Sequence, residues 1–205
     1  MLVIINYGMG NLQSVANAFN ALECPVQISS RPEDLREADR IVLPGVGAFG
    51  EGMSKLQTAG WATVLEEEVR QKSKPFLGIC LGMQFLATTG TEHGVHTGLG
   101  WIPGIVERIK SDEPTIRVPH IGWNDVSFTH KGSMYADMED SGVFYFVHSY
   151  VLRPENPGVI SGFCRHGIEF AASIETGNIW ATQYHPEKSQ KVGLKVLKNF
   201  LNMVR

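Results

Sequence analysis

Cysteine, surplus charge and long apolar runs are all scarce in this 205-residue chain. The three cysteines, Cys24, Cys80 and Cys164, are odd in number and scattered, which argues against a disulfide framework or a zinc ribbon. The 18 basic and 21 acidic residues give a net charge of −3. Nucleic-acid binding is therefore disfavoured, because no excess of positive charge is present to hold a phosphate backbone.

No uncharged run approaches the roughly 18 residues of a membrane-spanning helix, and the apolar start at residues 2–5 lacks the basic flank of a signal peptide. We therefore predict a cytoplasmic protein with free thiols. Low-complexity segments, internal repeats and breaks in composition are also absent from the sequence, and 43% of its residues are hydrophobic. This composition predicts one domain with one sizeable core, over residues 1–205.

The first ninety residues alternate short apolar runs with amphipathic stretches, as in a parallel sheet covered by crossover helices. The predicted strands cover residues 2–6, 26–29, 40–43 and 75–79. The predicted helices cover residues 11–22, 32–38, 61–71 and 81–88, and a glycine-rich loop covers residues 44–50.

The rest of the chain has β-prone segments separated by Gly and Pro, and ends in an amphipathic helix from Ser189. Thr176-Gly177-Asn178 suits a hairpin turn between the last two segments. The segments, several of them expected to be antiparallel, cover residues 104–109, 115–118, 143–152, 159–164, 170–175 and 179–183. The predicted fold is a single α/β domain with a central mixed, mostly parallel sheet flanked by helices and a β-rich second half.

The sharpest chemical signal is the pentapeptide Gly78-Ile79-Cys80-Leu81-Gly82, between a predicted strand and a predicted helix. It matches a nucleophile elbow, where the nucleophile is strained and the positions two before and two after it must be small. An elbow places the sulfur at a helix N-terminus, which favours thiolate, and leaves the Leu81 N–H to donate to an oxyanion. The alternative is an inert, buried cysteine.

A thiol nucleophile needs a base and a group that orients the base, and His185-Pro186-Glu187 offers both. In an extended segment, residues two apart point to the same side, so Glu187 can bond one imidazole nitrogen while the other faces Cys80. The tripeptide follows a predicted strand, where open α/β sheets hold their sites. The alternatives are an exposed loop histidine and a helix-capping glutamate.

The loop Gly45-Val46-Gly47-Ala48-Phe49-Gly50 is formally a G-x-G-x-x-G motif after a strand, which raises a nucleotide-binding module as a competing function. The context argues against this module, because the next predicted strand leads into Cys80 and not into an acidic residue for a ribose. The same glycines can aim a second backbone N–H at the oxyanion.

The remaining histidines give weaker signals. His93 and His96 share a polar loop, but no further ligand stands at the spacing of a zinc site, so we expect no metal. His148 follows the apolar run 143–147, where a substrate-holding histidine and a hydrogen-bonded core histidine are equally compatible with the sequence.

The elbow and the His-Pro-Glu tripeptide together resemble the signature of class I, triad-type glutamine amidotransferases. Within that family the chain is similar, from end to end, to the glutaminase subunits of imidazole glycerol phosphate synthases. Asn6 departs from the pattern, because the family has an aspartate there, and this affects local hydrogen bonding. The further matching segments are Tyr7–Leu12, Pro44–Gly47, Gly98–Gly100, Pro119–Asn124 and Tyr145–Tyr150.

The resemblance implies a flavodoxin-like domain that hydrolyses L-glutamine to glutamate and ammonia without a cofactor. Cys80 would attack the carboxamide, His185 would carry the proton to departing ammonia, and Glu187 would orient the imidazole. Backbone N–H groups of Val46 and Leu81 would hold the oxyanion. The residues that the resemblance places around glutamine are Gly45, Gly47, Gln84, Glu92, His148, Ser149 and Tyr150.

The resemblance also implies a partner, because ammonia must reach its acceptor without being protonated in bulk water, and this chain has no room for an acceptor domain. In the family the partner is a separate (β/α)8 barrel subunit, bound as a heterodimer, that makes imidazole glycerol phosphate and the AICAR ribonucleotide in histidine biosynthesis. The positions that match its contact surface are Asn11, Trp123, Tyr145 and Lys188. An enzyme that amidates a surface-polysaccharide sugar remains an alternative acceptor.

Overall fold

The computed structural model describes residues 1–111, 113–129 and 132–203. The strands are β1 (Leu2–Ile5), β2 (Val26–Ser29), β3 (Arg40–Gly45), β4 (Phe76–Cys80), β5 (Ala87–Gly90), β6 (His96–Thr97), β7 (Ile102–Arg108), β8 (His120–Phe128), β9 (Ser141–His148), β10 (Tyr150–Pro154), β11 (Ile160–His166), β12 (Ile168–Thr176) and β13 (Ile179–Thr182). The α-helices are α1 (Leu12–Asn20), α2 (Phe49–Thr58), α3 (Trp61–Leu65), α4 (Leu81–Gln84) and α5 (Gln190–Leu201). Short 3₁₀ turns are η1 (Pro32–Arg36), η3 (Ser133–Tyr135), η4 (Pro157–Val159) and η5 (Pro186–Lys188), and a π-helical segment is η2 (Glu66–Gln71).

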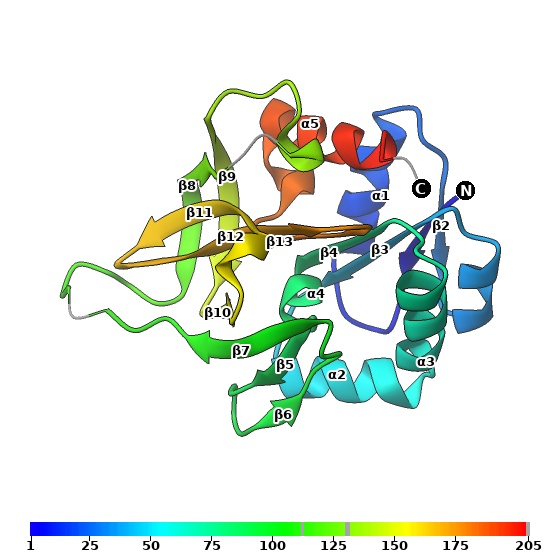
Figure 1. Ribbon diagram of the computed structural model, residues 1–205, viewed down its shortest axis with the longest axis horizontal. Helices are drawn as coiled ribbons and strands as arrows, with labels where there is room; N and C mark the ends of the chain where they lie inside the picture. Colours follow the sequence, from blue (N-terminus) through cyan, green and yellow to red (C-terminus); the bar gives the residue numbers. More distant parts are fainter. Residues whose placement is uncertain (112, 130–131, 204–205) are drawn as a thin grey trace.

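Within the described residues, nine strands form a mixed sheet in the order β2-β1-β3-β4-β13-β12-β11-β8-β9 (Figure 1). Pairing is parallel from β2 to β13 and antiparallel from β13 to β9. A smaller sheet, β10-β7-β5-β6, covers one face. The predicted mixed sheet is confirmed and continues through both halves of the chain. Its pairings divide equally, four parallel and four antiparallel, where a mostly parallel sheet was predicted, because the strands of the second half all add antiparallel beyond β13.

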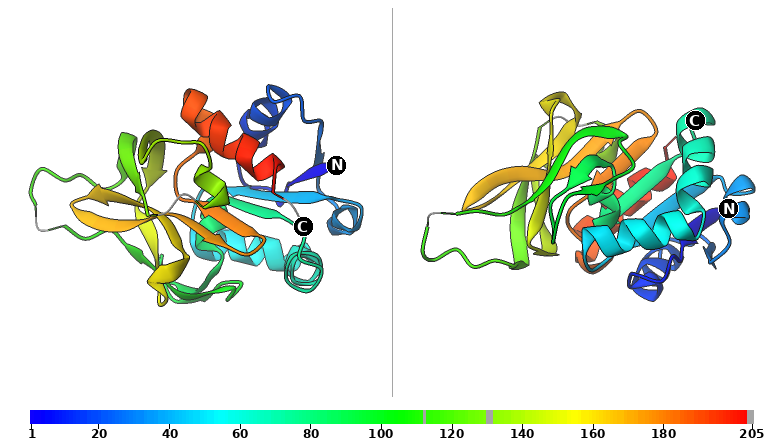
Figure 2. Two further views of the ribbon diagram at one scale, coloured as in Figure 1. Left: turned by 45° about the horizontal axis from the view of Figure 1, so that its top comes forward. Right: turned by 90° about the horizontal axis from the view of Figure 1, so that it is seen from below.

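Helices cover both faces of the parallel strands. α1 and α5 lie on one face, and α2 and α3 lie on the other, on the same side as the smaller sheet (Figures 1 and 2). The side chains of β1 alternate accordingly: Leu2 and Ile4 pack in the core under α1 and α5, whereas Val3 and Ile5 pack under α2 and α3. Burial on both faces explains why this strand is uniformly apolar. None of the described helices is long and apolar enough to cross a membrane.

Two predictions for the first half were wrong in detail. The helix predicted over residues 81–88 ends at Gln84, and residues 87–90 form β5 because β-branched Thr88 and Thr89 lie in a segment that pairs with β7. The loop predicted over residues 44–50 instead leads into α2, whose first N–H, from Phe49, donates to Glu92 at 2.9 Å. The side chain of a distant residue caps this helix, which no local pattern reveals.

In the second half, the strand predicted over residues 115–118 is a turn and an irregular segment, and the strand β8 begins later, at His120. The segment predicted over residues 143–152 divides at Ser149 into β9 and β10, which belong to different sheets. The predicted hairpin is confirmed, because β12 and β13 pair with Thr176 opposite Ile179, and Gly177 has a φ of +55°. α5 is confirmed as well.

Three histidines are packed together where β8, β9 and β11 meet. His120 stacks on His166 at 4.1 Å and on Phe146 at 4.7 Å between ring centroids, and its Nδ1 lies 3.0 Å from His148 Nε2. Burial, aided by His166, lowers the pKa of His120 to about 4, and burial lowers the pKa of His148 to about 3. Both rings are therefore neutral parts of the core at neutral pH.

These two histidines predict an acid-sensitive fold. Their folded-state pKa values lie below the unfolded value near 6.5, so the unfolded chain binds protons first as the pH falls. The contribution of these two histidines to stability should be full above about pH 6.5 and should decline toward pH 4, by about 1.4 kcal/mol per pH unit for each histidine that titrates only when unfolded. Urea unfolding from pH 7.5 to 5 measures this slope. His120→Phe should flatten it, and an unchanged slope in that variant would contradict the assignment.

The elbow helix α4 lies directly against β3, because Gly82 has no side chain. A Cβ built on Gly82 would be 1.8 Å from the carbonyl oxygen of Leu43. Gly82→Ala should therefore lower the free energy of unfolding by about 1–3 kcal/mol, measured by urea denaturation. Gly158→Ala is the control, since its new Cβ would meet only the end of the Asn156 side chain, at 3.0 Å. Similar losses in the two variants would refute the close packing.

Candidate active site

Cys80 is the last residue of β4 and the N-cap of α4, with φ of +55° and ψ of −106°. This left-handed backbone is strained for a residue with a side chain, and it turns the chain from strand to helix within one residue. The neighbours explain the need for glycine, because a Cβ on Gly78 would meet the carbonyl oxygen of Gly82 at 2.7 Å. The pentapeptide therefore folds as a nucleophile elbow, with Cys80 6% exposed.

His185 and Glu187 form a buried pair at the end of β13. His185 Nδ1 lies 2.8 Å from Glu187 Oε1, and the two side chains are 4% and 2% exposed. The segment is a 3₁₀ turn, η5, and not the extended stretch predicted from the sequence, but His185 itself has an extended backbone. The turn still places both side chains on one side, so the expected contact forms by a different geometry.

The backbone of His185 is tied to the far end of the sheet. Its N–H donates to the carbonyl of Tyr145 on β9 at 2.9 Å. Ser189 Oγ donates to the His185 carbonyl at 2.6 Å and accepts from the Tyr145 N–H at 3.0 Å. The imidazole is thus held between β13, β9 and the start of α5.

The pKa of His185 reflects its burial and the two side chains that flank the imidazole, Cys80 and Glu187. Burial acts to lower the pKa of the imidazole, but the sulfur of Cys80 and then the carboxylate of Glu187 outweigh it and raise this pKa to about 10. His185 Nε2 is buried and makes no well-formed hydrogen bond to the described residues, which leaves it for the sulfur. Such contacts are often long without substrate and tighten when it binds. The raised pKa keeps the His185 imidazole protonated at neutral pH.

A cavity of about 400 Å³ opens onto the sulfur. Segments that are far apart in the sequence line this cavity. They include the loop after β3, the elbow, the segment before β6, and the junction of β9 and β10. The lining residues are Val46, Gly47, Ala48, Cys80, Leu81, Gln84, Glu92, Pro119, Val147, His148, Ser149 and Tyr150. Of the residues predicted to bind glutamine, Gly45 is the one outside this set, and it lies directly behind the wall, where a Cβ would meet Tyr7 and Leu81.

The two predicted oxyanion donors are neighbours because of strand register. Gly45 pairs with Cys80 across β3 and β4, so the next residues, Val46 and Leu81, lie beside each other above the sheet. Leu81 begins α4, and the first N–H groups of a helix have no partner within it. Val46 is 43% exposed, and Gly47 has a φ of +100°.

Gln84 and Gln183 lie beside the sulfur. Gln84 Nε2 donates to the Tyr150 carbonyl at 3.0 Å and to Gln183 Oε1 at 3.1 Å. Gln183 Nε2 donates to Cys80 Sγ at 3.7 Å. Gln183 was not predicted from the sequence as a site residue. Its one sequence signal is a polar residue directly after the apolar strand β13.

The predicted partner positions gather on one surface. Trp123 on β8 is 48% exposed and packs edge-on against Tyr145 on β9 at 5.9 Å, and Lys188 Nζ lies 5.7 Å from the Tyr145 ring centroid. Asn11 caps α1 by accepting from the Ser14 N–H, and α1 packs against η5.

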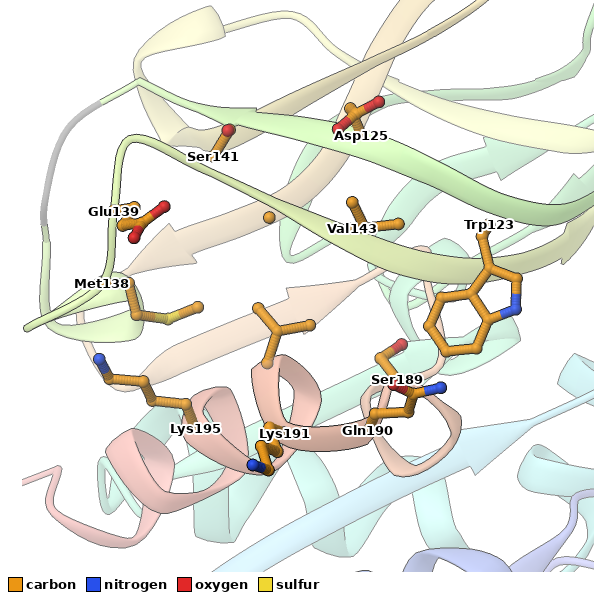
Figure 3. A pocket seen from close by; sticks show the side chains of 12 residues that line it. Trp123, Asp125, Met138, Glu139, Ser141, Val143, Ser189, Gln190, Lys191 and Lys195 are labelled. Atoms are coloured by element: carbon orange, nitrogen blue, oxygen red, sulfur yellow. The ribbon is translucent and has the colours of Figure 1, made fainter.

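A larger cavity, of about 700 Å³, lies between β9 and α5 (Figure 3). Trp123 stands at one end of it, and Lys191 and Lys195 project from α5 along its side. Cys80 is not among its lining residues. Its size therefore does not mark it as the reactive site.

Asn6, the one departure from the family pattern, keeps a polar role. Its Oδ1 accepts from the Gly8 N–H at 3.1 Å, and its Nδ2 donates to Ser30 Oγ at 3.0 Å. The loop that carries Tyr7 is therefore hydrogen-bonded without an aspartate.

Comparisons with known proteins identify a family and several relatives along the length of the chain. The glutamine amidotransferase class-I family matches residues 3–204. The imidazole glycerol phosphate synthase subunit HisH of Moorella thermoacetica is 44% identical over 100% of this chain and 95% of its own length. HisH of Geobacter sulfurreducens is 44% identical over 98% of each chain.

Two solved structures show the same fold at low sequence identity. PurLQS from Thermotoga maritima has a TM-score of 0.75 and 17% identity, over 98% of this chain and 97% of that chain. The glutaminase domain of CTPS from Trypanosoma brucei has a TM-score of 0.66 and 18% identity, over 100% of this chain and 94% of that chain. With a family match along almost its whole length and full-length relatives at 44% identity, the chain belongs to the class-I glutamine amidotransferase family.

Proposed function

We propose that this chain is the glutaminase subunit of an imidazole glycerol phosphate synthase, in the cytoplasm, and that it passes ammonia to a (β/α)8 barrel subunit in histidine biosynthesis. The observation that carries the proposal is the elbow cysteine, which lines a 400 Å³ cavity and interacts with the buried His185–Glu187 pair. The names of the relatives at 44% identity support this particular synthase over a sugar-amidating enzyme.

The first half of the reaction forms a thioester. The Cys80 thiolate attacks the carboxamide carbon of glutamine, a C–S bond forms, and the carbonyl oxygen becomes an oxyanion. When this intermediate collapses, the C–N bond breaks and the His185 imidazolium gives its proton to the leaving nitrogen, which departs as ammonia. Glu187 holds the His185 Nδ1 proton, so that Nε2 faces the reacting atoms.

The second half returns the enzyme to its starting state. Neutral His185 takes a proton from water, and the resulting hydroxide attacks the thioester carbon. The C–S bond then breaks, glutamate leaves, and the thiolate–imidazolium pair is restored. In both halves the N–H groups of Val46 and Leu81 receive the oxyanion, and losing one such donor costs about 3–4 kcal/mol of barrier.

Ammonia must then leave toward the partner without entering bulk water. The surface next to the site suits a protein partner, because apolar side chains are exposed on the edge strand β9 and on its neighbour β8. Ile121 is 61% exposed, Trp123 48% and Val143 45%. An exposed apolar patch of this kind marks an interaction site.

Cys80→Ala should abolish glutamine hydrolysis, and Glu187→Gln should reduce kcat by about 10²–10⁴-fold, because the imidazole loses its charged partner. A coupled assay of glutamate release measures both. The matched control is Glu51→Gln, at an exposed position on α2, which should keep full activity. Wild-type rates in Glu187→Gln would contradict its role.

The thiol should also react covalently with a glutamine analogue. Incubation with 6-diazo-5-oxo-L-norleucine should add one adduct mass to the Cys80 peptide and none to Cys24 or Cys164, because only Cys80 opens onto the substrate cavity. Peptide mass spectrometry identifies the site, and excess glutamine should protect it. Labelling that survives Cys80→Ala would count against the proposal.

We further propose that the Gly45–Val46 peptide is not aimed at the oxyanion until the partner binds. Hydrolysis by the isolated chain should then be slower by about 10²-fold, the value of one oxyanion donor, than in the complex with the barrel partner and its nucleotide ligand. Steady-state glutamate release with and without these components measures the ratio. Full activity of the isolated chain would reject this mechanism of activation.

A further inference from the structure

The hydrogen bond from Gln183 to the reactive sulfur is the end of a longer chain of bonds. Gln183 is fully buried and follows β13, two residues before His185. Its Nε2 lies 3.7 Å from Cys80 Sγ, and its Oε1 lies 3.1 Å from Gln84 Nε2. An amide can present either its oxygen or its nitrogen to a sulfur, and the neighbouring hydrogen bonds decide which of the two faces Cys80.

A backbone carbonyl fixes the orientation, because it can only accept hydrogen bonds. The Tyr150 carbonyl accepts from Gln84, so the nitrogen of Gln84 must point toward it. The same Gln84 nitrogen also donates to Gln183, which must therefore accept this hydrogen bond through Oε1. Gln183 is thereby obliged to turn its N–H toward Cys80, where a thiolate is a strong acceptor.

The same carbonyl also fixes two histidine tautomers. His148 Nδ1 lies 3.0 Å from the Tyr150 oxygen and must donate, so in the neutral ring Nε2 must accept. His120 Nδ1, at 3.0 Å, is therefore the donor to His148, and His120 Nε2 accepts from Asn124 at 3.1 Å.

A second backbone carbonyl, that of Arg165, fixes the orientation of Asn124 at the other end of this hydrogen-bonded chain. Asn124 Nδ2 also donates to the carbonyl of Arg165 at 3.0 Å, which independently requires its nitrogen to face His120. The donor directions deduced from the two carbonyls agree at every bond. The resulting chain has one consistent set of proton positions, and every side chain in it is uncharged.

We propose that Gln183 is a further catalytic residue, which donates its amide N–H to the Cys80 thiolate, and that Asn124, His120 and His148 are positioning residues that hold the Tyr150 carbonyl and, through it, Gln84. This inference rests on the proposed function, since it concerns the same nucleophile. It assigns a role to the Pro119–Asn124 segment, which the sequence analysis singled out without giving His120 a function.

The first test measures the chemical reactivity of the Cys80 sulfur, which does not depend on glutaminase activity. The rate of Cys80 alkylation by iodoacetamide is followed from pH 5 to 10 by mass spectrometry of the Cys80 peptide. Gln183→Met keeps the shape of the side chain and removes the hydrogen-bond donor. The midpoint of the pH profile should rise by about one pH unit, so that at a fixed pH below the midpoint the alkylation rate falls by about tenfold. Gln183→Glu should move it further, because a carboxylate repels the thiolate.

The other titratable groups that face the sulfur are unchanged in these variants. They are His185, directly before η5, with its partner Glu187, then Tyr7 from the loop after β1, and His148 and Glu92, which line the same cavity as Cys80. Gln57→Met, at an exposed position on α2, is the control and should leave the midpoint in place. A wild-type midpoint in Gln183→Met would overturn the proposal.

A matched pair of histidine variants tests the distal part of the chain, and also serves if Gln183→Met does not fold. His120→Phe keeps a ring that can stack on Phe146 but removes the donor to His148. His166→Phe alters the same stack but leaves the bonded chain intact, because His166 Nε2 pairs with the Arg117 carbonyl. Comparing the two variants therefore distinguishes the effect of losing the hydrogen-bond donor of His120 from the effect of altering the ring stack.

His120→Phe should raise the KM for glutamine by about fivefold, as expected for a lost hydrogen bond, with a smaller change in kcat. His166→Phe should stay within about twofold. Equal effects in the two variants would show that only packing matters and would overturn the positioning role. If wild-type protein shows the alkylation profile but does not hydrolyse glutamine, the proposed function fails while the role of Gln183 at the sulfur stands.

Discussion

The parallel pairing of β4 between β3 and β13 is the constraint on which the site depends. It places the carboxyl ends of three strands side by side, with Gly45 opposite Cys80 and Thr182 opposite Ile79. Each strand continues into one part of the candidate active site: the Val46 loop, the Cys80 elbow, or the His185–Glu187 pair. Because strand register is fixed by burial on both faces, a slip of one residue would reverse every side chain and separate all three parts.

The reactive centre could be predicted because its signals are short and physically specific. Glycines on both sides of Cys80 are required by contacts below 3 Å, and a histidine two residues before a glutamate gives an imidazole its partner in an extended segment or in a 3₁₀ turn. The alternating apolar runs likewise predicted the parallel half of the sheet. The length of α4 could not be predicted, because pairing of residues 87–90 with β7 outweighs the helical pattern.

The wider site depends on contacts between distant segments. Glu92 caps α2 from forty-three residues away, and the Tyr150 carbonyl joins Gln84 to His148. Gln183 carries no motif, and its position becomes informative only when the sulfur and Gln84 are found on either side of it. His148 was compatible with a substrate role and with a core role. The structure shows a ring that is buried and hydrogen-bonded and that also lines the cavity.

The bond from the His185 N–H to the Tyr145 carbonyl, reinforced on both sides by Ser189, links two regions that the sequence keeps forty residues apart. Tyr145 faces the outer surface with Trp123, while the imidazole faces the interior with Cys80. A displacement of β9 would therefore be transmitted directly to the backbone of His185 through this main-chain hydrogen bond. The geometric link between the exposed edge of the sheet and the candidate active site is therefore made by the backbone, and it does not depend on which side chain stands at position 145.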